Sequence, residues 1–382
     1  MAKAVTNSLL VKDLEVGSRL PWDVYDKYGM LLLKEDSVIV SGRQLQALVA
    51  RGIYRKKSRK EMAQEQQKGN ELEDDICPFD VVYEYCNRLD NITDSLQKNA
   101  KNRTIDIEQT IRKLCAELQA WANTDSDALL GAVHLCFGSS YSLMHAIHVA
   151  ILCELIGKRF IEDSQRRNTI MCAALTCNIA INDLQDSLQK QSEMLTDGQR
   201  QKIDSHPERA VKILHDNGIT NSLWLKSVLQ HHERIDGGGY PGGVSGDALL
   251  TESNLISIAD RYAAMIAGRS YRKGIHPKEV LKQIFVDRGK FFYEKLCLFL
   301  IKELGIFPPG AFVSLNNGEV GIVINRALDS VTPVVASIIS PRGAPYPQPI
   351  RRDCQQESYK IIQICELDKN ISLNLPVIWG YR

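Results

Sequence analysis

Apolar residues recur every three or four positions through the middle of this chain, from about residue 78 to residue 305. The stretches VKILHDNGI and NLISIADRYAAMIAG show this spacing clearly, and glycines stand near their expected ends. Such spacing gathers apolar side chains on one face of a helix, and glycine commonly ends helices. The pattern therefore predicts a helical bundle and a mainly α fold class.

The sequence before the bundle has a different pattern. Residues 1–56 contain short apolar runs broken by glycines and charged residues, which predicts a small β-rich accessory domain. One amphipathic helix is expected near its end, opening at Ser41 and closing at Gly52. Residues 57–76 are charged with almost nothing to bury, as expected of a linker, and residues 77–134 are predicted to form a helical connector.

The pattern changes again after FPPG. In residues 306–382, short alternating runs surround an Asn317-Gly318 pair, which is a typical hairpin signal. A small β-rich C-terminal tail domain is therefore expected to follow the bundle.

Composition and charge narrow the classes of function. The 382 residues are 44% hydrophobic and 24% charged, as in ordinary globular proteins, and the 47 basic and 46 acidic residues nearly cancel. That balance argues against broad electrostatic capture of DNA or of an anionic membrane. The ten cysteines show no C-x-x-C pair, and the best membrane candidate, AIHVAILCELIG, is too short to span a bilayer. We expect a reduced, cytoplasmic protein.

The candidate chemistry is concentrated in LQHHERIDGGGYPGG, which begins at Leu229. A lone histidine on a helix is usually structural, and adjacent histidines diverge by roughly 100° around a helix. His231 and His232 could still serve one compact metal cluster if further histidines and Asp260 join them. The glycines that follow allow positive φ and close backbone approach to a ligand. The alternative is a solvated turn between two helices.

These residues resemble the signature of the HD-GYP family, whose pattern is HHE-x-x-DG-x-GYP. YSLMHAIHVA (141–150), HPERAVKIL (206–214) and SIADRYAAM with AGRSYRKG (257–274) resemble its other landmarks. The resemblance covers residues 135–305, and the flanks resemble domains often attached to it. Members are helical, metal-dependent phosphohydrolases that open cyclic di-GMP. The resemblance implies metal-binding roles for His145, His206, His231, His232 and Asp260. It also implies a nucleotide or partner loop made of Asp236, Gly237, Gly239, Tyr240, Pro241, Arg269, Arg272 and Lys273.

The chain departs from the family at the pair of residues that gives it its name. Where members have a segment like AALLHDIGK, this chain has AALTCNIAI, with Cys177 for the histidine, Asn178 for the aspartate and Ile181 for the lysine. A bridging carboxylate neutralises and spaces two divalent cations, and a neutral amide cannot do so. A Cys177 thiolate would favour zinc over iron or manganese. Ile181 removes a cation that would hold the phosphate.

The sequence therefore favours a degenerate HD-GYP protein in bacterial cyclic di-GMP signalling, acting as a regulatory, nucleotide-binding or interaction module without catalytic residues. The alternatives are a weakly active cyclic di-GMP phosphodiesterase with a non-standard metal site, and a structural protein whose loop is a relic. The expected cofactor is one divalent transition metal (Zn, Fe or Mn) or none. The expected partners are cyclic di-GMP and, through the GYP loop, a diguanylate cyclase or another signalling protein, and a homodimer is left open.

Overall fold

The computed structural model describes residues 6–8, 16–17, 19–20, 24–25, 31–34, 36–41, 54–56, 76–97, 106–138, 140–268, 274–326, 332–367 and 371–381. The chain divides into two compact units, residues 1–74 and residues 75–382. The helix expected between Ser41 and Gly52 and most of the linker expected at 57–76 lie outside the described residues, so these two remain predictions.

The first unit contains a small antiparallel sheet. Its strands are β1 (Thr6–Ser8), β2 (Val24–Tyr25), β3 (Leu31–Leu33) and β4 (Tyr54–Lys56), in the spatial order β1-β4-β2-β3. Leu20 and Ile39 are buried beside it. The sheet confirms the predicted β-rich character of the N-terminal part.

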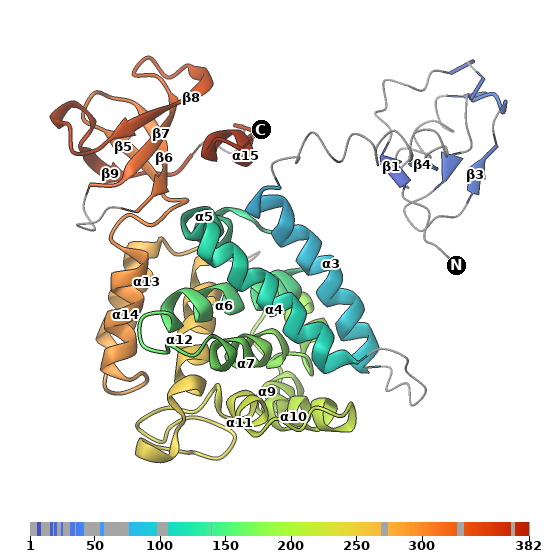
Figure 1. Ribbon diagram of the computed structural model, residues 1–382, viewed down its shortest axis with the longest axis vertical. Coiled ribbons are helices and arrows are strands. Elements are labelled where there is room, and N and C mark those ends of the chain that lie inside the picture. Colours follow the sequence, from blue (N-terminus) through green and yellow to red (C-terminus); the bar gives the residue numbers. More distant parts are fainter. Residues whose placement is uncertain are drawn as a thin grey trace. The chain divides into compact units, whose positions relative to one another are not determined.

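The second unit begins with a bundle of helices (Figure 1). Its first helices are α3 (Pro78–Gln97), α4 (Ile107–Thr124), α5 (Ser126–Leu135), α6 (Tyr141–Gly157), α7 (Ser164–Thr176), α8 (Asn182–Leu188) and α9 (Asp197–Asp204). They are followed by α10 (His206–Asp216), α11 (Ser222–Gln230), the 3-10 turn η2 (Gly246–Ala248), α12 (Thr251–Ile266), α13 (Pro277–Val286) and α14 (Glu294–Leu304). The helices confirm the mainly α fold class.

Helix α6 is the centre of this bundle. It begins at Ser140, whose hydroxyl caps the amide of Leu143, and from Ser142 to Gly157 every residue is buried. A helix that is apolar on all sides belongs in the core, and α6 contacts α3, α4, α5, α7, α8, α12 and α14. The apolar stretch that is too short for a bilayer is therefore the central core helix. Among the described residues, no helix has the length and apolar character needed to cross a membrane.

A five-stranded antiparallel sheet follows the bundle, in the order β8-β7-β6-β5-β9. Its strands are β5 (Phe312–Leu315), β6 (Val320–Asn325), β7 (Val334–Ile339), β8 (Pro345–Asp353) and β9 (Ile361–Ile364), with the turn η3 (Glu357–Tyr359) before β9 and α15 (Leu375–Trp379) after it. The hairpin predicted at Asn317-Gly318 joins β5 to β6, and Gly318 has the positive φ that the turn requires.

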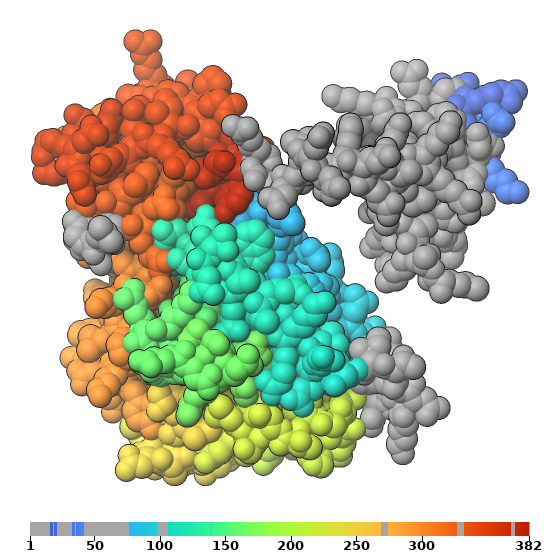
Figure 2. Space-filling model, viewed as in Figure 1, coloured from blue at the N-terminus to red at the C-terminus, as the bar shows by residue number. Residues whose placement is uncertain are grey.

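The sheet and α15 pack directly on one end of the bundle (Figure 2). The Trp379 ring meets the Phe79 ring edge to face, with centroids 4.7 Å apart. A Cβ at Gly131 would lie 2.6 Å from the same indole, so glycine leaves the room that Trp379 fills. Buried residues of β6 and β7, including Ile322 and Ala336, join the apolar core of the helices. The tail and the bundle therefore share one core.

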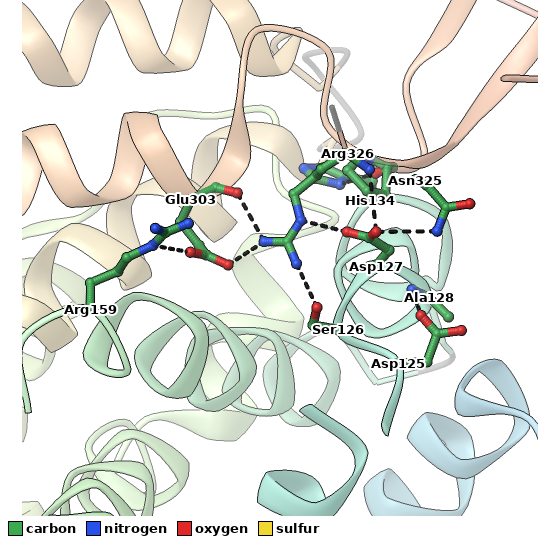
Figure 3. A network of polar contacts seen from close by, with 10 residues as sticks. Asp125, Ser126, Asp127, Ala128, His134, Arg159, Glu303, Asn325 and Arg326 are labelled. Carbon is green, nitrogen blue, oxygen red and sulfur yellow. Dashed lines mark hydrogen bonds and ion pairs between the residues drawn. The ribbon is translucent and has the colours of Figure 1, made fainter. Parts of the chain in front are cut away.

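Arg326 fixes this junction through charge (Figure 3). Its guanidinium bonds to the carboxylates of Asp127 on α5 and Glu303 on α14, and to the Ser126 hydroxyl at 2.5 Å. Glu303 also accepts from Arg159 at 2.5 Å. The side chains of Arg326, Asp127 and Glu303 are 20%, 18% and 8% exposed, so each charge is largely withdrawn from water and depends on its partners.

Replacing Arg326→Met should destabilise the protein by about 3 kcal/mol, because the Asp127 carboxylate would lose its guanidinium partner and Glu303 would be left with Arg159. Lys212→Met is the matched control, since Lys212 is 75% exposed and pairs with Asp216 on the surface. That change should cost less than about 0.5 kcal/mol. Urea unfolding followed by circular dichroism measures both, and equal effects would contradict the role given to Arg326.

Candidate functional site

A cavity of about 490 Å³ opens beside the central helix. Its walls come from α6, α8 and α12, the start of α10, the loop after α7 and the loop after α11. The polar lining includes Tyr141, His145, Asn178, Gln185, Glu193, His206, His232, Tyr240 and Asp260. The predicted metal residues thus lie at one cavity, except that His231 lies behind this lining, in contact with His206.

Three histidines form a compact cluster at one side of the cavity. One ring nitrogen from each of His206, His231 and His232 lies within 4.8 Å of the others. The Nδ1 of His206 donates to the carbonyl of Ile203 at 2.5 Å, and the Nδ1 of His231 donates to the carbonyl of Val228 at 2.6 Å. Both Nε2 atoms are then acceptors, and they face each other at 3.1 Å.

Burial keeps these rings uncharged. It lowers the pKa of His206 to about 3, and it lowers the pKa values of His231 and His232 as well. Two neutral nitrogen lone pairs at 3.1 Å repel each other, and a shared cation would relieve the repulsion. Neutral imidazole held by a backbone carbonyl is also the usual protein ligand of zinc. The cluster therefore fits one transition-metal ion.

His145 and Asp260 also line the cavity, bonded to each other. His145 Nε2 donates to Asp260 Oδ1 at 2.8 Å, which joins α6 to α12. Burial opposes ionisation of Asp260, but the hydrogen bond from His145 outweighs it and holds the pKa of the carboxyl below its ordinary value. Asn178 Nδ2 approaches the same oxygen at 3.5 Å. One oxygen of the Asp260 carboxylate is therefore approached by both the His145 ring and the Asn178 amide.

Cys177 and Asn178, which stand where the family has its histidine and aspartate, have different surroundings. Asn178 and Ile181 line the cavity, and the buried Asn178 Oδ1 has no hydrogen-bond partner among the described residues. Cys177 is fully buried, its thiol bonds to the carbonyl of Ala174, and burial raises the pKa of that thiol. A protonated thiol turned to its own helix is a poor metal ligand.

The glycine loop is built onto the histidine motif. The Glu233 carboxylate is buried and accepts from the amides of Gly242 at 2.6 Å and Val244 at 3.0 Å. A Cβ at Gly239 would lie 2.5 Å from the Glu233 Cα and 2.5 Å from the His232 carbonyl oxygen. Only glycine fits there, because both neighbours are backbone or backbone-attached atoms.

Other loop residues have local roles. Gly237 has φ of +74°, which favours glycine, and Asp236 accepts from the Gly238 amide at 3.0 Å and pairs with Arg234. The Tyr240 ring stacks on His232 with centroids 4.7 Å apart, and a cis peptide joins it to Pro241. The loop thus places a tyrosine over the histidine cluster. Arg269, Arg272 and Lys273 lie outside the described residues.

Several other residues line the cavity without a role predicted from the sequence. Part of the lining comes from α8 and from residues 191–195, including Gln185 and Glu193. These two segments carry no recognisable sequence motif. Tyr141 stacks on His145 with centroids 5.5 Å apart, one helical turn before it. Tyr141 and His145 are four residues apart, a spacing that places two side chains next to each other on one face of a helix, so their contact could have been predicted from the sequence.

Comparison with known proteins finds relatives that cover this part of the chain. Residues 133–294 match the model of the HD domain family. The chain is 28% identical to the cyclic di-GMP phosphodiesterase PA4108 of Pseudomonas aeruginosa, over 62% of this chain and 58% of that protein. It is 24% identical to the cyclic di-GMP phosphodiesterase PdeB of Borreliella burgdorferi, over 49% of each chain. It is 28% identical to the 3'3'-cGAMP-specific phosphodiesterase 3 of Vibrio cholerae, over 44% of this chain and 38% of that protein.

The chain therefore spans about two fifths to three fifths of these relatives' own lengths. Among solved structures, it is similar to Bd1817, described as an HDG"Y"P protein from Bdellovibrio bacteriovorus, with 16% identity and a TM-score of 0.47 over 78% of this chain and 99% of that chain.

The histidine cluster on a helical bundle, together with the family match, defines residues 133–294 as an HD domain. The predicted resemblance to the HD-GYP family is confirmed for this region, since it matches the HD domain model and its relatives include proteins named as cyclic di-GMP phosphodiesterases. The functional roles assigned to individual site residues remain predictions.

Gly239→Ala should destabilise the protein by about 2 kcal/mol, because the added methyl group meets backbone that cannot move aside. Gly198→Ala on α9 is the matched control: a Cβ there meets nothing within 4 Å, and alanine favours the helix. Urea unfolding of both variants checks the prediction. If Gly239→Ala were as stable as Gly198→Ala, the close packing of the loop on the histidine motif would be wrong.

Proposed function

We propose that this protein binds cyclic di-GMP as a regulatory module and hydrolyses it slowly or not at all. The observation that carries the proposal is the composition of the cavity lining around Asp260. There, Asn178 supplies a neutral amide beside Asp260 where a second metal would need another carboxylate.

The kinds of charged side chain that line the cavity support this proposal. Among its described lining residues, Asp260 and Glu193 are acidic and neither lysine nor arginine is present. Ile181 lines the wall as a hydrocarbon group. Among the described lining residues, a phosphodiester would therefore face two carboxylates and no cationic side chain to hold its developing negative charge. Binding can tolerate that when other contacts compensate, whereas phosphoryl transfer depends on such charge stabilisation.

The three-histidine cluster supports one metal in the proposed function. His206, His231 and His232 would hold it, and a bound metal ion supplies a Lewis acid that attracts phosphate oxygen. Tyr240 would cover the ligand from the glycine loop, since its ring lines the cavity beside His232. Several relatives are named as cyclic di-GMP phosphodiesterases, which makes cyclic di-GMP the first ligand to test.

A weakly active phosphodiesterase is the second candidate, and the same cluster favours it. A single metal with three histidine ligands leaves a position open for water. The GYP loop as a surface for a diguanylate cyclase or another signalling protein also remains a proposal. The stacking of Tyr240 on His232 favours a ligand-facing role for that ring.

Unmodified protein with added Mn²⁺ or Zn²⁺ should turn over cyclic di-GMP at least about a thousandfold more slowly than an active HD-GYP enzyme assayed in parallel, a loss of about 4 kcal/mol in barrier stabilisation. Chromatographic separation of cyclic di-GMP from its linear product measures the rate. Replacing Cys177→His, Asn178→Asp and Ile181→Lys together should raise the rate, although only in part, because Cys177 is fully packed and histidine is larger.

Two histidine-to-alanine variants decide between a regulatory module and an active enzyme. Robust turnover by the unmodified protein that disappears in His232→Ala but persists in His215→Ala, an exposed histidine on α10, would overturn the proposal in favour of an active enzyme. Absence of cyclic di-GMP binding in calorimetry would overturn the binding role itself.

A further inference from the structure

Helices α13 and α14 form a hairpin along one edge of the bundle (Figure 1). The inner face of the hairpin belongs to the core, because Ile284 and Leu300 are fully buried and both helices contact α12. The loop between the helices is fixed as well, since the Lys290 carbonyl accepts from the Asp236 amide at 3.0 Å. The outer face is therefore held firmly against the rest of the bundle.

The outer face of this hairpin is basic. Among the residues from Pro277 to Leu304, two of the exposed ones are acidic, Glu279 and Glu294. Six of the exposed ones are basic, namely Lys278, Lys282, Arg288, Lys290, Lys295 and Lys302. The face thus has an excess of four positive charges, whereas the whole chain has 47 basic and 46 acidic residues. The charge balance of the chain conceals a local basic surface.

The lysines of this face have no anionic partner within the described structure. Arg288 lies 3.7 Å from the Glu294 carboxylate, but none of the five lysine ammonium groups makes a hydrogen bond or an ion pair with a described residue. Lys278 and Lys282 are four residues apart on α13, a spacing at which like charges repel each other. Contact with an anionic surface would relieve this repulsion.

Apolar side chains are exposed among the same lysines. Val286 is 71% exposed, Leu298 is 48% exposed and Phe285 is 37% exposed. Val286 follows Lys282 by one helical turn, and Leu298 precedes Lys302 by one turn, so each aliphatic group lies in a row with a lysine. Lysines interspersed with exposed apolar groups on a helix surface are typical of binding at a membrane interface.

We propose that the outer face of the α13–α14 hairpin docks on an anionic lipid surface. The lysine ammonium groups bind among the lipid headgroups, and Val286 and Leu298 enter the boundary between headgroups and acyl chains. The kind of basic residue favours lipid over an acidic protein. Interfaces between proteins are depleted of lysine and enriched in arginine, whereas five of the six basic residues here are lysines.

The test is flotation of the full-length protein with lipid vesicles. One set is phosphatidylcholine alone, and the other also contains roughly one third phosphatidylglycerol, which is anionic. The protein should float with the anionic vesicles at low salt and remain unbound with the neutral ones. Addition of about 0.5 M NaCl should release most of the bound protein, because salt screens the attraction between exposed charges.

Neutralising three lysines of the hairpin should weaken binding to the anionic vesicles at least about thirtyfold, since each basic residue near such a surface contributes about fivefold. The variant carries Lys282→Gln, Lys295→Gln and Lys302→Gln. The matched control removes the same charge from exposed positions on α9, α10 and α11, through Lys202→Gln, Lys212→Gln and Lys226→Gln. The control should lose less than about threefold in binding.

The apolar contact has its own variant, Val286→Thr combined with Leu298→Gln. It should weaken binding to the anionic vesicles about tenfold and leave the salt dependence unchanged, because it removes buried hydrocarbon and no charge. Thermal melting checks the fold of every variant. All the substituted side chains are exposed, so each variant should melt within a few degrees of the unmodified protein.

Several outcomes would overturn the docking face. They are absence of binding to the anionic vesicles at low salt, equal binding to the neutral vesicles, and equal losses in the hairpin and control lysine variants. Binding of poly-glutamate that the hairpin lysine variant abolishes, without binding to vesicles, would instead assign the face to an acidic protein. No nucleotide enters these measurements, so their outcome is independent of the proposed function.

Discussion

The direct hydrogen bond between His145 and Asp260 is the interaction on which the site depends. It joins the central helix α6 to α12 at 2.8 Å, and both residues line the cavity. Both groups are mostly buried, with side chains 3% and 16% exposed, so each needs a partner. In the described structure they satisfy each other directly. A metal ion at this wall would have to replace that bond, and Asn178 offers no charge to help it.

The two sides of the cavity therefore differ in their chemistry. One side has three neutral histidines: His206 and His231 are held by backbone carbonyls, and Tyr240 stacks on His232. The other side has a carboxylate already bonded to a histidine. Gly239 and Glu233 make the first side rigid, because loop backbone packs on motif backbone and a buried carboxylate holds two loop amides. The proposal of one metal with little hydrolysis follows from this asymmetry.

Much of the fold and part of the site could be predicted from the sequence. The helical period gave the bundle, the Asn317-Gly318 pair gave a hairpin, and the HHE and glycine motif gave the family, because each is a local signal. The packing of the tail on the bundle was not predicted. It depends on contacts such as that between Arg326 and Asp127, which are 199 positions apart in the chain. The thiol of Cys177 turning to Ala174 likewise follows from tertiary packing.

Anomalous diffraction at the zinc edge, from crystals of the full-length protein equilibrated with zinc, tests the asymmetry of the site most directly. The account predicts one anomalous peak at most in the cavity, coordinated by His206, His231 and His232, with the hydrogen bond between His145 and Asp260 intact. A second peak bound by Asp260 beside Asn178 would contradict it, because it would show that a neutral amide suffices where a second carboxylate was thought necessary.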